Sequence, residues 1–290
     1  MSIFVPYTAG FQKILHGPAA ARPAAAYGTT VTPGASNAKG SYAQLIAGAS
    51  LTDDVYGIFI NFNNGFVAAA PRTTLCDIGI DPAGGTTYSV LIANLIASNA
   101  GTLCADREAN GGYTYFFPLF IKAGSSVGCA AAVDNATAGS IRIYAKFYCQ
   151  PKRPDAVNVG TFVETIGAAT ANSQGTTVTP GQASEGAWTS LGTTAKRTWY
   201  HQLGFSTRDD DLAIAANLGY FADLSAGAAG GELLLLENTQ IRVNNTDDSV
   251  GQDLNVSFGG EVVAGATIWG RAQCSGTPEA SSMAAYCLGG

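Results

Sequence analysis

The stretch Gly28-Thr-Thr-Val-Thr-Pro-Gly34 decides the fold, because it recurs unchanged as Gly175-Thr-Thr-Val-Thr-Pro-Gly181. The two copies begin 147 residues apart, at positions 28 and 175. Weaker matches follow in the same order, and they pair residues 54–60 with 199–205, 84–95 with 230–240, and 143–149 with 268–274. Copies of about 100 residues or more are too long for solenoid repeats. The sequence therefore predicts an internal duplication that forms two tandem domains.

Each copy has the pattern of a β-protein. Short β-branched or aromatic runs are separated by clusters of Gly, Pro, Asn and Asp, as in strands joined by turns. Residues 141–148 alternate strictly between an apolar face and a polar face, which is the period of a half-buried strand. The linker is placed at Pro151-Lys-Arg-Pro154. We predict an all-β chain of two jelly-roll-like β-sandwich domains, over residues 28–155 and 156–290.

The two ends of the chain differ from these domains in composition. Residues 1–27 are rich in Ala, Pro and Gly and are predicted to be an N-terminal arm. Residues 275–290 are interpreted as a tail, which is either an attachment arm or a frayed terminus. Large apolar side chains are poorly suited to solvent, so we expect an interface that includes the following candidates: Phe4, Tyr7, Phe11 and Ile14 of the arm, and Trp269 of the second domain. For Trp269, stacking on a sugar is an equally good interpretation.

The charge balance limits the classes of partner. The 290 residues carry 21 acidic and 15 Lys or Arg side chains, which gives a net charge of −6 and predicts no binding to nucleic acid or to anionic membranes. Only 12% of residues are charged while 47% are hydrophobic, so we expect a surface covered by partners. The start lacks a basic region before its first lysine, Lys13, and no apolar run approaches a membrane span. We therefore expect synthesis in a cytoplasm without Sec export.

Motifs for chemistry are largely absent from the sequence. His16 and His201 are the two histidines, and no Ser elbow or CxxC spacing accompanies them, so His201 is interpreted as a packed or a surface histidine of a predicted strand. The acidic clusters 209–211 and 247–248 are interpreted as solvated turns rather than calcium ligands. A glycosidase pair of acids remains open, because such carboxylates need only meet in space. We expect no enzyme, no cofactor and no metal site.

The cysteines are assigned by strand alternation. Cys149 and Cys274 are expected to point into separate domain cores at matching sites, and not to be bonded to each other. Cys129 is also expected to point inward, and a disulfide between Cys129 and Cys149 is left open. Cys287 lies in the predicted tail and is expected to be the accessible thiol, available to bond a neighbouring subunit.

Three segments carry a resemblance to a known class of protein. Phe116-Phe-Pro-Leu-Phe-Ile-Lys-Ala-Gly-Ser-Ser126, together with residues 142–148 and 151–160, resembles virion structural proteins of tailed bacteriophages. The resemblance implies a virion component in the decoration, collar, tail or fibre, which binds other virion proteins and itself, and it supplies no catalytic residues. The alternative is a carbohydrate- or receptor-binding module on the virion surface, and a glycan hydrolase is a third interpretation.

Overall fold

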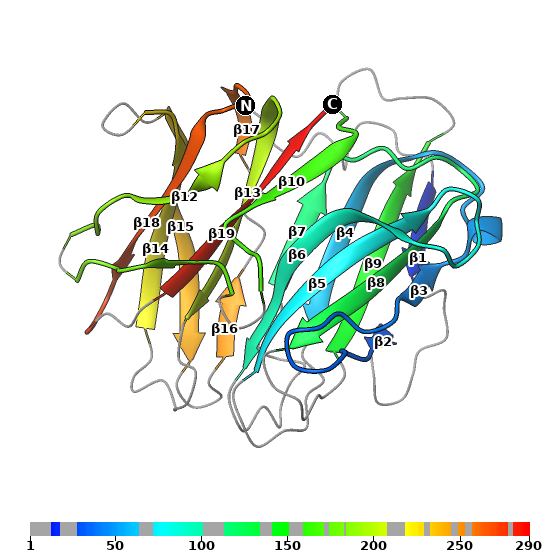
Figure 1. Cartoon of the computed structure of the whole chain (residues 1–290), viewed down its shortest axis with the longest axis horizontal. Coiled ribbons are helices and arrows are strands. Elements are labelled where there is room, and N and C mark those ends of the chain that lie inside the picture. Colours follow the sequence, from blue (N-terminus) through cyan, green and yellow to red (C-terminus); the bar gives the residue numbers. More distant parts are fainter. Residues whose placement is uncertain are drawn as a thin grey trace.

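The computed structural model describes a chain built of β-strands (Figure 1). In the described part, the only helical element is the short 3₁₀ turn η1 (Gly48–Ser50), and the predicted all-β fold class is confirmed. None of the described residues form a helix with the length and apolar character that a bilayer span requires. The described residues are 13–17, 28–63, 72–100, 113–133, 141–150, 159–170, 174–182, 184–207, 218–228, 233–244, 249–252, 257–277 and 281–290.

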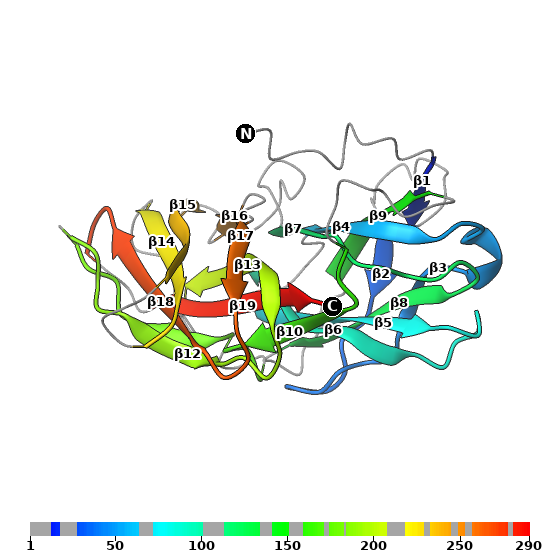
Figure 2. The same cartoon turned by 90° about the horizontal axis from the view of Figure 1, so that it is seen from above.

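The first half of the chain forms a sandwich of two antiparallel sheets. Figure 2 shows β4 and β9 of one sheet lying over β5 and β8 of the other. The strand order, in which β2-β9-β4-β7 faces β3-β8-β5-β6, is that of a jelly roll. The first sheet contains β1 (Lys13–Gly17), β2 (Thr29–Val31), β9 (Ile141–Cys149), β4 (Val55–Asn63) and β7 (Tyr113–Phe117), and the second contains β3 (Ala43–Ile46), β8 (Ser126–Val133), β5 (Arg72–Asp81) and β6 (Ser89–Ala100).

The second half repeats this order. Strands β11-β19-β13-β17 face β12-β18-β14-β15, and one bridge from Ser249 to Ala100 joins the second sheets of the two sandwiches through β16. The first sheet contains β10 (Phe162–Ile166), β11 (Thr176–Val178), β19 (Ser281–Gly289), β13 (Thr198–Thr207) and β17 (Ser257–Val262), and the second contains β12 (Thr189–Thr193), β18 (Thr267–Cys274), β14 (Leu218–Ala226), β15 (Leu233–Asn244) and β16 (Ser249–Gln252).

The repeated heptapeptide occupies the same place in both sandwiches. Val31 on β2 pairs with Ile141 on β9, and Val178 on β11 pairs with Ser281 on β19. Both valines are completely buried, because this register points them between the sheets. The predicted duplication into tandem jelly-roll-like sandwiches is confirmed, and Val178 is placed like Val31.

The structure corrects the end of the predicted repeat. Residues 268–274 belong to β18, the counterpart of β8, whereas the counterpart of β9 is β19. The predicted match of Ile268 with Ile143 is therefore wrong. The error arises because neighbouring strands of one sandwich share the same alternation of apolar and polar residues. The period of this alternation alone therefore cannot distinguish one strand from its neighbour. The predicted tail is consequently a central strand, and β19 is buried at all nine positions.

The predicted N-terminal arm also contains a strand. Residues 13–17 form β1, which pairs with β9 from Lys13 opposite Cys149 to Gly17 opposite Ala145. Lys13 additionally forms an ion pair with Asp53 at 3.2 Å. The arm as predicted over 1–27 is therefore wrong in this segment, because proline on either side of a short apolar run breaks helices but permits an edge strand.

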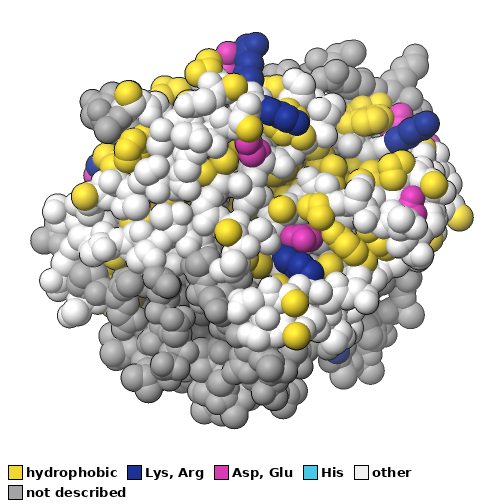
Figure 3. Space-filling view, viewed as in Figure 1, with side chains coloured by type: hydrophobic (Ala, Val, Ile, Leu, Met, Phe, Trp, Pro, Cys, Tyr) yellow, Lys and Arg dark blue, Asp and Glu magenta, His cyan; other side chains and the backbone are white. Residues whose placement is uncertain are grey.

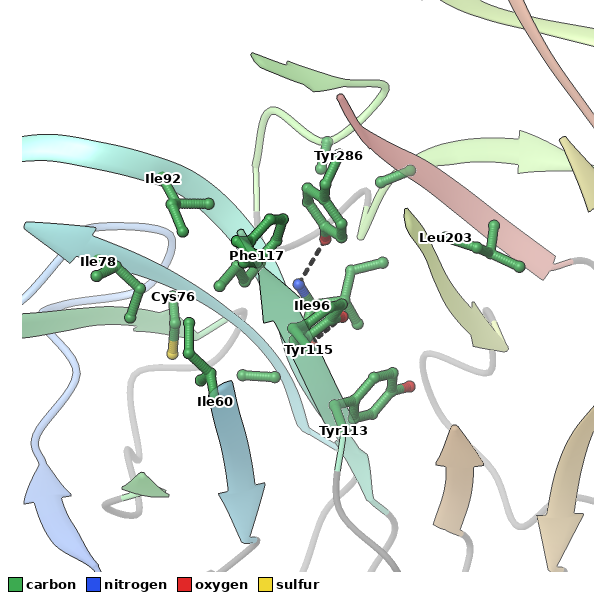
Figure 4. Close-up of a cluster of buried hydrophobic side chains, with 14 of the residues drawn as sticks. Ile60, Cys76, Ile78, Ile92, Ile96, Tyr113, Tyr115, Phe117, Leu203 and Tyr286 are labelled. Carbon is green, nitrogen blue, oxygen red and sulfur yellow. Dashed lines mark hydrogen bonds between the residues drawn. The ribbon is translucent and has the colours of Figure 1, made fainter. Parts of the chain in front are cut away.

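The two sandwiches meet on a shared hydrophobic core. The outer face of β19 and β13 packs against β6 and β7, and Tyr286 inserts its ring beside Tyr115 (Figure 4). The ring centroids of these tyrosines lie 5.3 Å apart at an interplanar angle of 88°. The Ile96 backbone N–H donates to the Tyr286 hydroxyl at 2.8 Å, and that hydroxyl donates to the Asn94 carbonyl at 3.1 Å. Tyr286 of the second sandwich thus fills the open edge of the first.

Further polar contacts fix this junction. The Tyr113 hydroxyl donates to the Phe205 carbonyl at 2.8 Å, and the Tyr200 hydroxyl donates to the Phe116 carbonyl. Buried hydroxyls that have partners avoid the cost of an unsatisfied polar group and also define one relative placement of the sandwiches. The chain therefore behaves as one packed unit with two lobes.

Candidate binding site

The outer face of the second sandwich presents an aromatic ring between two amides. Phe221 on β14 pairs directly with Gln240 on β15 and with Gln273 on β18. Residues directly opposite each other in antiparallel strands share a face, so the three side chains form one row. Phe221 is 43% exposed, whereas its neighbours Tyr220 and Ala222 are buried on the inner face.

A pocket of about 270 Å³ opens beside this row. Gly219 creates the hollow, because a Cβ atom built on it would meet only the Ser275 Oγ, at 3.8 Å. The backbone below is fixed: the Gly219 N–H donates to Ser275 Oγ at 2.9 Å, and the Ser275 N–H donates to the Gly219 carbonyl at 2.9 Å. Of the residues that the structure describes, those that line the pocket are all uncharged: Gln182, Gly219, Tyr220, Phe221, Gln240, Gln273, Cys274 and Ser275.

The charged side chains next to this pocket form ion pairs and hydrogen bonds with one another. The buried Asp223 carboxylate accepts from Arg271 Nε at 2.8 Å and from the Asn238 backbone N–H at 2.6 Å. Arg271 also forms an ion pair with Glu185, and its guanidinium lies 4.3 Å from the centre of the Trp188 ring. A buried charge is tolerated when it is paired and hydrogen-bonded, so this cluster is a self-contained network.

The first sandwich contains the matching carboxylate. Asp77 on β5 accepts from Lys39 Nζ at 2.7 Å and from the Asn94 backbone N–H at 2.8 Å. Asn94 and Asn238 have φ values of 52° and 51°, in the left-handed region that asparagine tolerates better than most residues. In both copies a buried aspartate therefore holds an irregular position of the adjacent strand, although its cation comes from a loop in one copy and from β18 in the other.

Neither aspartate was predicted from the sequence. The signal that would have found them is their spacing of 146 residues, from 77 to 223, which matches the offset of the duplication. An aspartate inside an apolar strand at the same place in both copies predicts a paired, buried carboxylate. The pocket itself leaves no such signal, because its lining comes from three strands and a loop whose registers the sequence does not display.

The predicted interface residues are not brought together in the part of the chain that the structure describes. Trp269 is half-buried on β18, and its Nε1 donates to the Gly227 carbonyl at 3.0 Å, outside the pocket lining. Ile14 is 44% exposed on β1 of the other sandwich. Phe4, Tyr7 and Phe11 lie outside the described residues.

The prediction of Cys287 as an accessible thiol is wrong. Cys287 is completely buried on β19, and burial raises the pKa of its thiol well above the ordinary value. The sequence placed it in a tail because the small residues around it lack an evident apolar face, but β19 is covered on both sides. Cys129, Cys149 and Cys274 are buried and unbonded, as are Cys76 and Cys287. The inward orientation predicted for the first three is confirmed, although Cys149 and Cys274 are not at matching sites.

His201 is a packed strand residue, which is one of the two placements that the sequence left open. Its side chain is completely buried, and its Nε2 lies 3.0 Å from the Thr198 Oγ1. Burial lowers the pKa of His201 to about 4, because the charged imidazolium loses its hydration there. The acidic clusters 209–211 and 247–248 lie outside the described residues. Within the described ranges, no three His, Cys, Asp or Glu side chains gather closely enough to hold a metal ion.

Comparison with known proteins gives structural similarity alone. No family model and no curated protein matches the chain. Among solved structures, it is similar to PNGase F, a glycosylasparaginase from Flavobacterium meningosepticum, with 8% identity, 96% of both chains covered and a TM-score of 0.37. PNGF-II is similar with 9% identity and a TM-score of 0.35 over 95% of this chain and 65% of that one. The cowpea mosaic virus top component is similar with 8% identity and a TM-score of 0.29, over 92% of this chain and 95% of that chain.

The similarity to PNGase F contradicts the expectation that the chain is not an enzyme. That expectation depended on missing sequence motifs, and catalytic groups that meet only in space leave no such motif. A likeness with a TM-score of 0.37 and 8% identity does not assign an activity to this chain.

Proposed function

We propose that the chain is a structural component of a phage particle that binds neighbouring virion subunits, as a decoration, collar, tail or fibre protein. The observation that carries the proposal is the shared core of the two tandem jelly rolls. Tyr286 of one sandwich fills the edge of the other, so the relative placement of the lobes is fixed by buried contacts. A subunit that must present several contact surfaces at once benefits from such rigidity, because little conformational entropy is lost on assembly.

The described surface supports the same proposal. On the face seen in Figure 3, charged side chains are few and several lie beside a side chain of opposite charge, and hydrophobic side chains gather in the region where β5 and β6 lie in Figure 1. Single apolar residues on a surface are ordinary, but several on a charge-poor surface favour contact with other subunits. The large apolar side chains that are most exposed in the described part are Val90, Leu233 and Val263, at 55%, 50% and 61%.

Location on the particle tests this proposal. Antibodies raised against the purified chain should label intact source particles in electron microscopy, and chemical cross-linking of those particles should join the chain to other virion proteins or to a second copy. Antibodies against a host cytoplasmic protein provide the matched control. Purified particles that lack the chain by mass spectrometry would show that it is not a virion component.

A further inference from the structure

We propose that the pocket beside Phe221 binds one pyranose ring of a neutral saccharide. A structural role in a particle does not require this site, so the inference is independent of the proposed function. Three features of the pocket favour such a ligand: its shape, the aromatic ring at its side and the amides that flank that ring.

The aromatic ring supplies the stacking surface. Phe221 is held by two cross-strand neighbours while 43% of it remains exposed. An exposed ring on a rigid sheet offers an apolar face at little conformational cost. The C–H face of a pyranose is the complementary apolar surface, and its hydroxyls project around the rim of the ring.

The amides supply the polar contacts in the plane around that ring. Gln240 and Gln273 flank Phe221 on opposite sides, and Gln182 adds a third amide from the loop after β11. Each amide has both a donor and an acceptor group, which matches neighbouring hydroxyls that also donate and accept. Because the described lining residues are all uncharged, the ligand that complements them is a neutral polyol ring.

The size of the pocket limits the ligand to one ring. Its volume of about 270 Å³ lies just below the range of about 300 to 1,000 Å³ that is usual for drug-sized ligands. The hollow over Gly219 gives the ring depth, since no side chain fills it. Arg242 lies opposite Gly219 across β14 and β15, but outside the lining.

The three corresponding positions of the first sandwich, all among the described residues, hold other side chains. Strand pairing places Leu75 opposite Ile96 and Ala132, in the positions that Phe221, Gln240 and Gln273 hold in the second sandwich. Leu75 is 1% exposed, and Ile96 is completely buried because β13 of the second sandwich packs over β6. The outer face of the first sandwich at this place therefore packs against the other lobe, whereas the corresponding face of the second sandwich is free for a ligand.

Saturation-transfer NMR on the full chain tests the proposal. The probes are the methyl glycosides of glucose, galactose and mannose, with glucuronic acid as the charged comparison. At least one neutral glycoside should bind with a dissociation constant on the order of millimolar, as expected for a single ring. A screen in which no neutral glycoside binds, or in which glucuronic acid binds more tightly than all of them, would overturn the proposal.

Two variants test whether the ligand binds in the pocket beside Phe221. Phe221→Ala should weaken binding by about tenfold through loss of the stacking surface. Gly219→Val should abolish binding by filling the hollow, and valine suits a strand position whose φ is not in the left-handed region. Leu233→Ala is the matched control, because it removes an exposed apolar side chain of β15 outside the lining, and it should bind like the wild type. Unchanged affinity in folded Gly219→Val would show that the ring binds elsewhere.

Discussion

Replacing His201 by glutamine should remove most of one acid-sensitive contribution to stability. The folded imidazole has a pKa of about 4, compared with about 6.5 when exposed. As the pH falls below 6.5, the unfolded chain binds a proton that the folded chain does not, so the free energy of unfolding decreases until about pH 4. At about 1.4 kcal/mol per pKa unit, the loss is about 3 kcal/mol for this single side chain. Above pH 6.5 and below pH 4 the contribution is constant.

Urea unfolding followed by tryptophan fluorescence between pH 7.5 and 4 measures this effect. The wild type should lose about 3 kcal/mol more than His201→Gln across this range, because the glutamine does not titrate. The subtraction removes the contribution of carboxylates, which both proteins share. His16→Gln removes the chain's other histidine from an exposed position and controls for histidine loss as such. Equal losses in the wild type and in His201→Gln would refute the burial of a neutral imidazole at this site.

Three further perturbations test the packing. Tyr286→Phe leaves the buried Ile96 N–H without its acceptor and should lower the free energy of unfolding by about 1–3 kcal/mol in urea titration; an unchanged midpoint would contradict the junction. Asp223→Ala leaves Arg271 without its buried partner and should cost about 3–5 kcal/mol, whereas Glu185→Ala, at the exposed side of the same network, should cost less than about 1 kcal/mol. Cys287 should resist alkylation in the native protein, as read by peptide mass spectrometry, and rapid native labelling would disprove its burial.

The sequence predicted the fold class because two signals were local. The repeated heptapeptide revealed the duplication, and the alternation in residues 141–148 revealed a strand with one buried face. Prediction from the sequence failed where the correspondence between strands depends on how they pair. The alternation of residues 267–274 is equally compatible with the counterpart of β8 or of β9. Only the register shows that Phe221 lies between Gln240 and Gln273. Strand β19 was not predicted because it is buried on both faces, and such a strand lacks the alternation of apolar and polar residues that indicates a strand.

The junction at Tyr286 also sets the order in which the chain becomes folded during synthesis. Tyr286 follows its backbone partner Ile96 by 190 residues, so the first sandwich emerges from the ribosome with its edge between β6 and β7 uncovered. Contacts of such high sequence separation close slowly and leave apolar surface available for aggregation in the interval. The first lobe is therefore expected to complete its packing only after β19 has been synthesised. A nascent chain stalled before residue 281 should be more sensitive to protease in its first lobe than the released protein.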